Sequence, residues 1–149
     1  MAFAFDDPVL VLDNMPLIAH GWQEVLRTLH PSIVVEYAES VFHVLSAPDY
    51  RQRSFSVIVL GSAEDRSPGS LLLPAAGLKA KFPGSRIVIL TDQYDPAVIA
   101  QTGQGTIDAC LHKYEGPNEI RNTWIHLTAG RPYLSPLLQS LYNEYRLNR

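Results

Sequence analysis

Reactive side chains stand at the ends of apolar runs in this chain. Asp13 and Asn14 follow one run directly, Thr91 ends another, and Lys113 follows a third. Carboxylate oxygens suit Mg²⁺, a hydroxyl can bond a phosphoryl oxygen, and a lysine can pair with the phosphoryl charge. Together these residue types describe a site that accepts a phosphoryl group. Such a site needs a carboxylate nucleophile, and the run that should supply it ends instead in Gly61.

The elements that position these residues alternate between two patterns. Short runs rich in Val, Ile and Leu are typical of strands covered on both faces, and they are separated by segments with helical spacing. The predicted strands are Val9–Leu12, Ile33–Val35, Val57–Leu60, Ile87–Leu90 and Ile107–His112. The predicted helices cover about residues 16–29, 39–45, 70–82, 95–103 and 117–129. This order predicts an α/β, flavodoxin-like (βα)5 three-layer sandwich with a parallel five-stranded sheet. Its ligand sites should lie at the carboxyl ends of the strands, where the reactive residues fall.

A further helix is expected at the C-terminal end. Ser135 is a good N-cap and Pro136 suits the first helical position. We therefore divide the chain into a main domain, 1–134, and a linker or dimerisation helix, 135–149. The apolar stripe of this helix could fold back on the main domain, pair with a second copy, or lead towards another domain. Its candidate interface residues are Leu138, Leu141, Tyr142 and Tyr145.

Composition restricts the class of protein. With 149 residues, 46% of them apolar and 18% charged, the chain is one globular domain rather than a disordered segment. A net charge of −3 with scattered basic residues gives no electrostatic footprint for nucleic acid, and the apolar runs are too short to cross a membrane. The single cysteine, Cys110, excludes an internal disulfide and fits a small buried residue. We expect a cytoplasmic protein.

Four segments together carry a family resemblance: Val9–Leu17, Ile87–Thr91, Asp108–Lys113 and Ala129–Pro136. Their order and spacing over nearly the whole chain resemble the receiver domains of two-component response regulators, particularly the NarL/FixJ-like transcription factors. The resemblance implies a site in which an aspartate after the third strand accepts a phosphoryl group with the help of Mg²⁺.

The same resemblance implies that this chain is atypical. Thr91 and Lys113 match the family, and Asp13 matches its first acid, but Asn14 replaces the second acid and Gly61 replaces the nucleophile. The five residues therefore form a degenerate phosphorylation pocket, with no catalytic residue, metal or cofactor expected. We expect Asp13 and Lys113 to form an ion pair and the Thr91 hydroxyl to be satisfied by backbone.

The function predicted from these residues is a phosphorylation-independent signalling, interaction and dimerisation module in transcription regulation. The partner would be a second copy or another regulator. The resemblance implies that this partner meets the face around the fourth and fifth helices, here residues 95–102 and 117–129. DNA would be reached only through a helix-turn-helix that this chain lacks. One alternative is a sensor that binds an anion or nucleotide in the degenerate pocket. Others are an enzyme using Asp13 as nucleophile, or a rescue of the acceptor by Ser62, Glu64 or Asp65.

Overall fold

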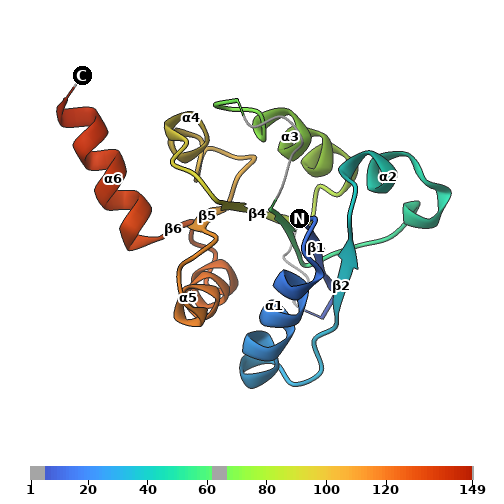
Figure 1. Cartoon of the computed structure of the whole chain (residues 1–149). Helices are drawn as coiled ribbons and strands as arrows, with labels where there is room; N and C mark the ends of the chain where they lie inside the picture. The colour runs from blue at the N-terminus through green and yellow to red at the C-terminus, as the bar shows by residue number, and fades with distance from the viewer. Residues whose placement is uncertain (1–5, 62–66, 149) are drawn as a thin grey trace.

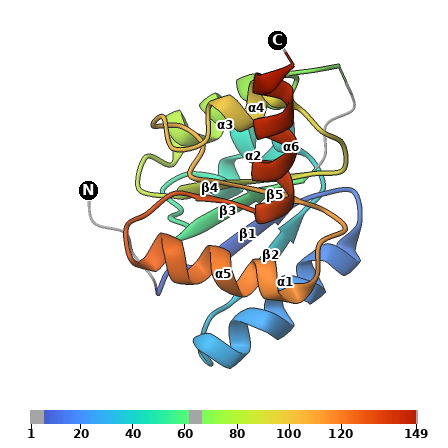
Figure 2. The ribbon, with the colours of Figure 1, turned by 90° about the vertical axis from the view of Figure 1, so that its left-hand side faces the viewer.

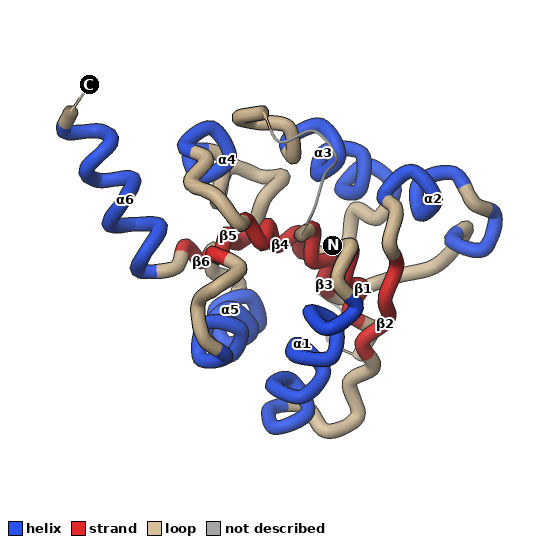
Figure 3. Tube along the Cα trace, in the orientation of Figure 1, coloured by secondary structure: helices blue, strands red, loops and turns tan. Residues whose placement is uncertain are grey.

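The structure, a computed structural model, describes residues 6–61 and 67–148. A parallel sheet lies between two layers of helices (Figures 1 and 3). The strands are β1 (Val9–Leu12), β2 (Val35–Ala38), β3 (Val57–Leu60), β4 (Arg86–Thr91), β5 (Ala109–His112) and β6 (Tyr133–Leu134). The helices are α1 (Pro16–Leu29), α2 (Val41–Ser46), α3 (Leu72–Lys81), α4 (Pro96–Ala100), α5 (Pro117–Thr128) and α6 (Pro136–Leu147), with a 3-10 turn η1 (Pro48–Tyr50). Ser62, Glu64 and Asp65, the alternative acceptors considered above, lie outside the described residues.

The strand order is β2-β1-β3-β4-β5-β6, and every pair is parallel. This confirms the predicted α/β, flavodoxin-like fold but corrects the predicted number of strands from five to six. The extra strand is β6, which donates a hydrogen bond from Tyr133 N to Asp108 O (3.0 Å). Two residues are too few to give a strand pattern in the sequence, so β6 could not be predicted from periodicity.

Alternating side chains of the strands build two cores, one on each face of the sheet. The core towards α1 and α5 contains the valines of β1 and β3, which pack with Trp22 and Trp124. The core towards α2, α3 and α4 contains the Leu and Ile residues of the same strands. Both faces are covered, as expected for a parallel sheet. The carboxyl ends of the strands therefore remain as the edge where polar residues can gather.

The second strand is displaced from its predicted position. The prediction was Ile33–Val35, whereas β2 spans Val35–Ala38. The Gln23 side chain binds backbone groups at the start of this segment, where it donates to Ile33 O (3.1 Å) and accepts from Val35 N (3.0 Å). Those backbone groups are thereby satisfied outside the sheet. As an edge strand with Glu36 at its second position, β2 also lacks the continuous apolar run of a strand covered on both faces.

Other boundaries differ by smaller amounts. Strand β5 begins at Ala109 rather than at residue 107, and α4 ends at Ala100 rather than near residue 103. Helix α3 begins at Leu72 rather than at residue 70. Glycines and bends at helix ends shorten the regular part, and these are the least predictable positions of a helix.

Helix α6 starts where the sequence predicted. Ser135 accepts a hydrogen bond from Leu138 N (3.4 Å) as the N-cap. Figure 2 shows α6 at the β6 end of the sheet, running beside α4. The Leu138 side chain is fully buried in the core on the α4 side, and Leu141 and Tyr142 pack partly against it. The base of α6 therefore folds back on its own domain, and Leu138 is corrected from an interface residue to a core residue.

Candidate functional site

The centre of the carboxyl edge is a buried ion pair between β1 and β5. Lys113 Nζ lies 3.0 Å from Asp13 Oδ2, and their side chains are 6% and 0% exposed. Asp13 Oδ1 accepts a hydrogen bond from Met15 N (2.8 Å), which fixes the carboxylate at the start of α1. No other described residue donates a hydrogen bond to Oδ2. The expected Asp13–Lys113 pair is therefore present, and the lysine supplies the charge compensation for this oxygen.

Gly61 follows β3 beside this pair, and its missing side chain is what makes room for Asp13. The Gly61 amide donates to Leu12 O (2.8 Å), which holds the two strand ends together. A Cβ built on Gly61 would lie 2.0 Å from Asp13 Oδ2 and 3.0 Å from its Cγ, far inside van der Waals contact. The Asp13 carboxylate thus occupies the space into which a side chain at position 61 would project.

Thr91 at the end of β4 is satisfied by local backbone, as expected. Its hydroxyl donates to Gln93 O (2.5 Å) and accepts from Gln93 N (3.2 Å), which forms a tight turn after the strand. Its carbonyl accepts from Lys113 N (2.6 Å) and ties β4 to the lysine. The hydroxyl is therefore committed to the turn, and its main chain helps to position Lys113.

The described residues at this edge do not fit a Mg²⁺ site. A hard cation of this kind needs several oxygen ligands, usually carboxylates. Asp13 is already paired with Lys113, Asn14 is exposed and carries no charge, and Gly61 has no side chain. Within residues 6–61 and 67–148, no group of three His, Cys, Asp or Glu side chains could hold a metal ion.

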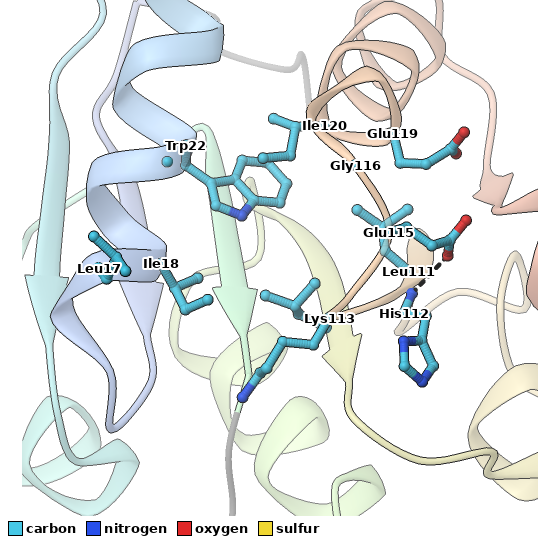
Figure 4. Close-up of a pocket in the computed structure, with 12 residues that line it drawn as sticks. Leu17, Ile18, Trp22, Leu111, His112, Lys113, Glu115, Gly116, Glu119 and Ile120 are labelled. Atoms are coloured by element: carbon cyan, nitrogen blue, oxygen red, sulfur yellow. Dashed lines mark hydrogen bonds between the residues drawn. The ribbon is translucent and has the colours of Figure 1, made fainter.

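A small hollow lies beside the ion pair, between α1 and α5 (Figure 4). Its volume is about 110 Å³, and Leu17, Ile18 and Trp22 form one wall. Glu115 lies on the opposite side, where it accepts a hydrogen bond from His112 N (2.9 Å). Figure 4 shows the Lys113 side chain pointing away from the acidic side chains. The lysine charge is therefore directed to Asp13 and not into this hollow.

Cys110 lies in β5 and is fully buried. Burial raises the pKa of its thiol to about 12, with smaller contributions from Asp95 and Glu115. The thiol is consequently protonated at neutral pH and is a packing residue, as expected from its place in a strand.

One tertiary contact at the β6 end could not be predicted from the sequence. The Tyr133 hydroxyl donates a short hydrogen bond to the Glu119 carboxylate of α5. Burial, together with this bond, raises the pKa of Tyr133 to about 12. No local spacing rule joins residues 14 apart across a strand and a helix, so no signal in the sequence indicates the pair.

The six-stranded parallel sheet and its flanking helices define the class of fold. The chain has the fold of the receiver domains of LuxR/NarL-type response regulators. No protein-family profile and no curated protein sequence matches it.

Several solved structures are similar to the chain although each is less than 20% identical to it in sequence. One is the isolated REC domain of RcsB from Salmonella enterica serovar Typhimurium, solved in the presence of the phosphomimetic BeF3-. It is 18% identical with a TM-score of 0.72, over 91% of this chain and 98% of that one. Another is a LuxR family DNA-binding response regulator from Silicibacter pomeroyi, 19% identical with a TM-score of 0.69, over 87% and 97%. A third is RcsB solved as two dimers bound to two parallel DNAs, 18% identical with a TM-score of 0.70, over 93% of this chain and 68% of that one.

Proposed function

We propose that this domain is an atypical receiver, a phosphorylation-independent signalling, interaction and dimerisation module in the regulation of transcription. One observation carries the proposal: the Asp13 carboxylate fills the space beside Gly61 and pairs with Lys113. In this proposal Gly61 stands at the position of the phosphoryl acceptor, and Asp13 takes the lysine that would otherwise pair with the phosphoryl group.

A phosphoryl group can switch a receiver only through a difference in interaction free energy between two states of the domain. Without a nucleophile, and with Lys113 already paired, this domain gains no such difference from phosphoryl donors. Its output surface is then fixed, or it is set by binding of a partner.

The same observation gives no support to the anion sensor at the Asp13–Gly61 edge. That alternative needed space at Gly61 and a lysine charge directed towards the ligand. The Asp13 carboxylate occupies the space at Gly61 and neutralises the charge of Lys113. The observation also gives no support to Asp13 as an enzyme nucleophile, because the ion pair with Lys113 holds the carboxylate in place.

The proposal is tested by sedimentation velocity over a concentration series, with and without Mg²⁺ and beryllofluoride. The isolated RcsB REC domain is the positive control, because its structure was solved with this phosphomimetic. We expect the sedimentation coefficient of this protein to be the same in both conditions. A change in the sedimentation coefficient comparable to that of the control would show that the carboxyl edge still binds a phosphoryl-like group. That result would refute the proposal.

Dimerisation is assigned in this proposal to the outer part of α6. Tyr145 is 38% exposed and Leu147 is 84% exposed, whereas Leu141 is partly buried against the core. Tyr145 also stacks with Tyr142, at a centroid distance of 6.0 Å, so the exposed ring is held in place. Contact with DNA would require a helix-turn-helix outside this chain, and the partner would be a second copy or another regulator in the cytoplasm.

The test is a double substitution, Tyr145→Glu with Leu147→Glu. We expect a folded monomer, because two charges would have to be desolvated at the contact. Phe42→Glu, at a residue of α2 that is 79% exposed, is the matched control and should leave association unchanged. An unaltered dimer in the double variant would rule out this surface.

Among the described residues, none of the helices has the length and apolar character that spanning a membrane requires.

A further inference from the structure

A second polar hollow lies at the opposite edge of the sheet, where strands β4, β5 and β6 begin. It has a volume of about 240 Å³ and is lined on the polar side by Arg86, Asp108 and Arg131. Arg86 is the first residue of β4, and Asp108 directly precedes β5. Parallel strands therefore bring together side chains from three separate parts of the chain at this edge.

The charges in the hollow are unequal. Asp108 Oδ2 accepts hydrogen bonds from Ile87 N (2.9 Å) and from Lys79 Nζ (3.3 Å). Asp108 Oδ1 lies 3.7 Å from Arg86 Nη1. One carboxylate is thus shared by a lysine and an arginine, while Arg131 makes no ion pair with a carboxylate of the described residues. Two arginines and one carboxylate therefore line the hollow, and it is the charge of Arg131 that has no carboxylate partner in the part of the chain that the structure describes, in a chain whose net charge is −3.

The backbone around the hollow is uncovered. Gly105 and Gly130 line it with φ angles of +116° and +76°, a region that residues with a side chain rarely adopt. A Cβ placed on either glycine meets no atom within 4 Å. A ligand can therefore approach the two turns closely, which is how glycine turns commonly admit oxyanions.

The geometry points to a binding site for a phosphate-type oxyanion between Arg86 and Arg131. Guanidinium groups present paired N–H donors that match the oxygens of a phosphate, and they remain charged at all physiological pH values. A volume of about 240 Å³ exceeds the roughly 30 Å³ share of one water molecule several-fold, so the hollow has room for a phosphate and an attached group. The site lies at the edge away from Asp13 and Lys113, so it is independent of the proposed loss of phosphorylation.

Inorganic phosphate and adenosine monophosphate are the two probes, titrated at low ionic strength into the full 149-residue chain. Binding is followed by the amide signals of the glycines in a ¹⁵N-correlated NMR spectrum. Gly103, Gly105 and Gly130 lie at the hollow, while Gly21 and Gly116 line the other cavity and act as internal controls. We expect saturable shifts of the first group only. Tighter binding of the nucleotide identifies a phosphorylated metabolite as the ligand, and equal binding identifies free phosphate.

The deciding variant is Arg131→Gln, with Arg121→Gln as the matched control. Both arginines are exposed, and neither makes an ion pair with a carboxylate of residues 6–61 or 67–148 whose loss would destabilise the domain. Loss of one charge-assisted contact should weaken binding about tenfold or more in Arg131→Gln. The control should bind as the unsubstituted chain does. No shift of the three glycine signals, or equal weakening in both variants, would overturn the site.

Discussion

The buried pair of Asp13 and Lys113 can be tested by removing each partner separately and then both. Asp13→Asn keeps the shape of the side chain and its acceptor for Met15 N, but it leaves the lysine without its carboxylate. Lys113→Met keeps most of the apolar stem and leaves a carboxylate buried without its cation. Breaking a buried ion pair by removing one partner costs about 3–5 kcal/mol, because the charge that remains is uncompensated.

The structure predicts that the two single costs differ. The Lys113 side chain is long and 6% exposed, so its ammonium can turn towards water, and Asp13→Asn should cost about 3 kcal/mol. The Asp13 side chain is short, fully buried and fixed by Met15 N, so Lys113→Met should cost more, about 4 kcal/mol. For a domain of this size these losses correspond to decreases in Tm of roughly 6–16 °C.

The double variant distinguishes an ion pair from two independent packing residues. Once Lys113 is methionine, changing Asp13 to asparagine removes the uncompensated charge and should stabilise the protein. The double variant is therefore expected to be more stable than Lys113→Met alone, with a coupling energy of about 3 kcal/mol.

Urea unfolding followed by circular dichroism gives the free energies directly, and equal m-values confirm that the unfolding transitions are comparable. The reasoning is refuted if Asp13→Asn destabilises the Lys113→Met variant by as much as it destabilises the original chain. It is refuted equally if both single changes cost less than 1 kcal/mol.

Three further predictions follow from the described contacts. Gly61→Asp should not restore labelling by acetyl phosphate, and Gly61→Ala should cost at least about 1–3 kcal/mol in a urea titration, because a Cβ there lies 2.0 Å from Asp13 Oδ2. Cys110, whose thiol pKa is raised to about 12 by burial, should not react with Ellman's reagent at pH 8 unless urea unfolds the domain. Burial, together with the bond to Glu119, raises the pKa of Tyr133 from 10.0 to about 12, so the protonated hydroxyl contributes fully to stability below pH 10 and this contribution is lost as the pH rises through 12. Tyr133→Phe should remove that part of the alkaline decrease in Tm and cost about 1 kcal/mol at pH 7.

The sequence predicted those elements whose patterns are strong and repeated. The buried strands β1, β3 and β4 lie within a residue or so of the predicted runs, because a strand covered on both faces must be apolar at every position. The start of α6 was predictable from Ser135 and Pro136, which satisfy the requirements of a helix start. The Asp13–Lys113 pair was predictable too, because the carboxyl ends of parallel strands lie at one edge of the sheet and both residues directly follow such an end.

What could not be predicted depends on contacts between distant residues. The Gln23 side chain binds Ile33 O and Val35 N, and these contacts over ten or more residues leave no periodic pattern in the sequence. The burial of Leu138 depends on which side of the sheet α6 turns to, which an apolar stripe does not specify. The cationic hollow around Arg131 is assembled from the starts of three strands, and the order of those strands in the sheet is a property of the fold.

A permanent ion pair and a phosphoryl group differ in what they can do for a protein with two states. A shift from 1:99 to 99:1 needs about 5.5 kcal/mol of differential binding energy, and a receiver obtains that from a group that is added and removed. The Asp13–Lys113 pair forms without any added group, so its contribution stabilises the arrangement of the carboxyl edge seen in this structure. If the proposed function holds, any change of state in this domain comes from a ligand or partner that binds elsewhere with unequal affinity for the two states. The proposed oxyanion site and the exposed end of α6 are both remote from that edge, and each could supply such a difference without chemistry at Gly61.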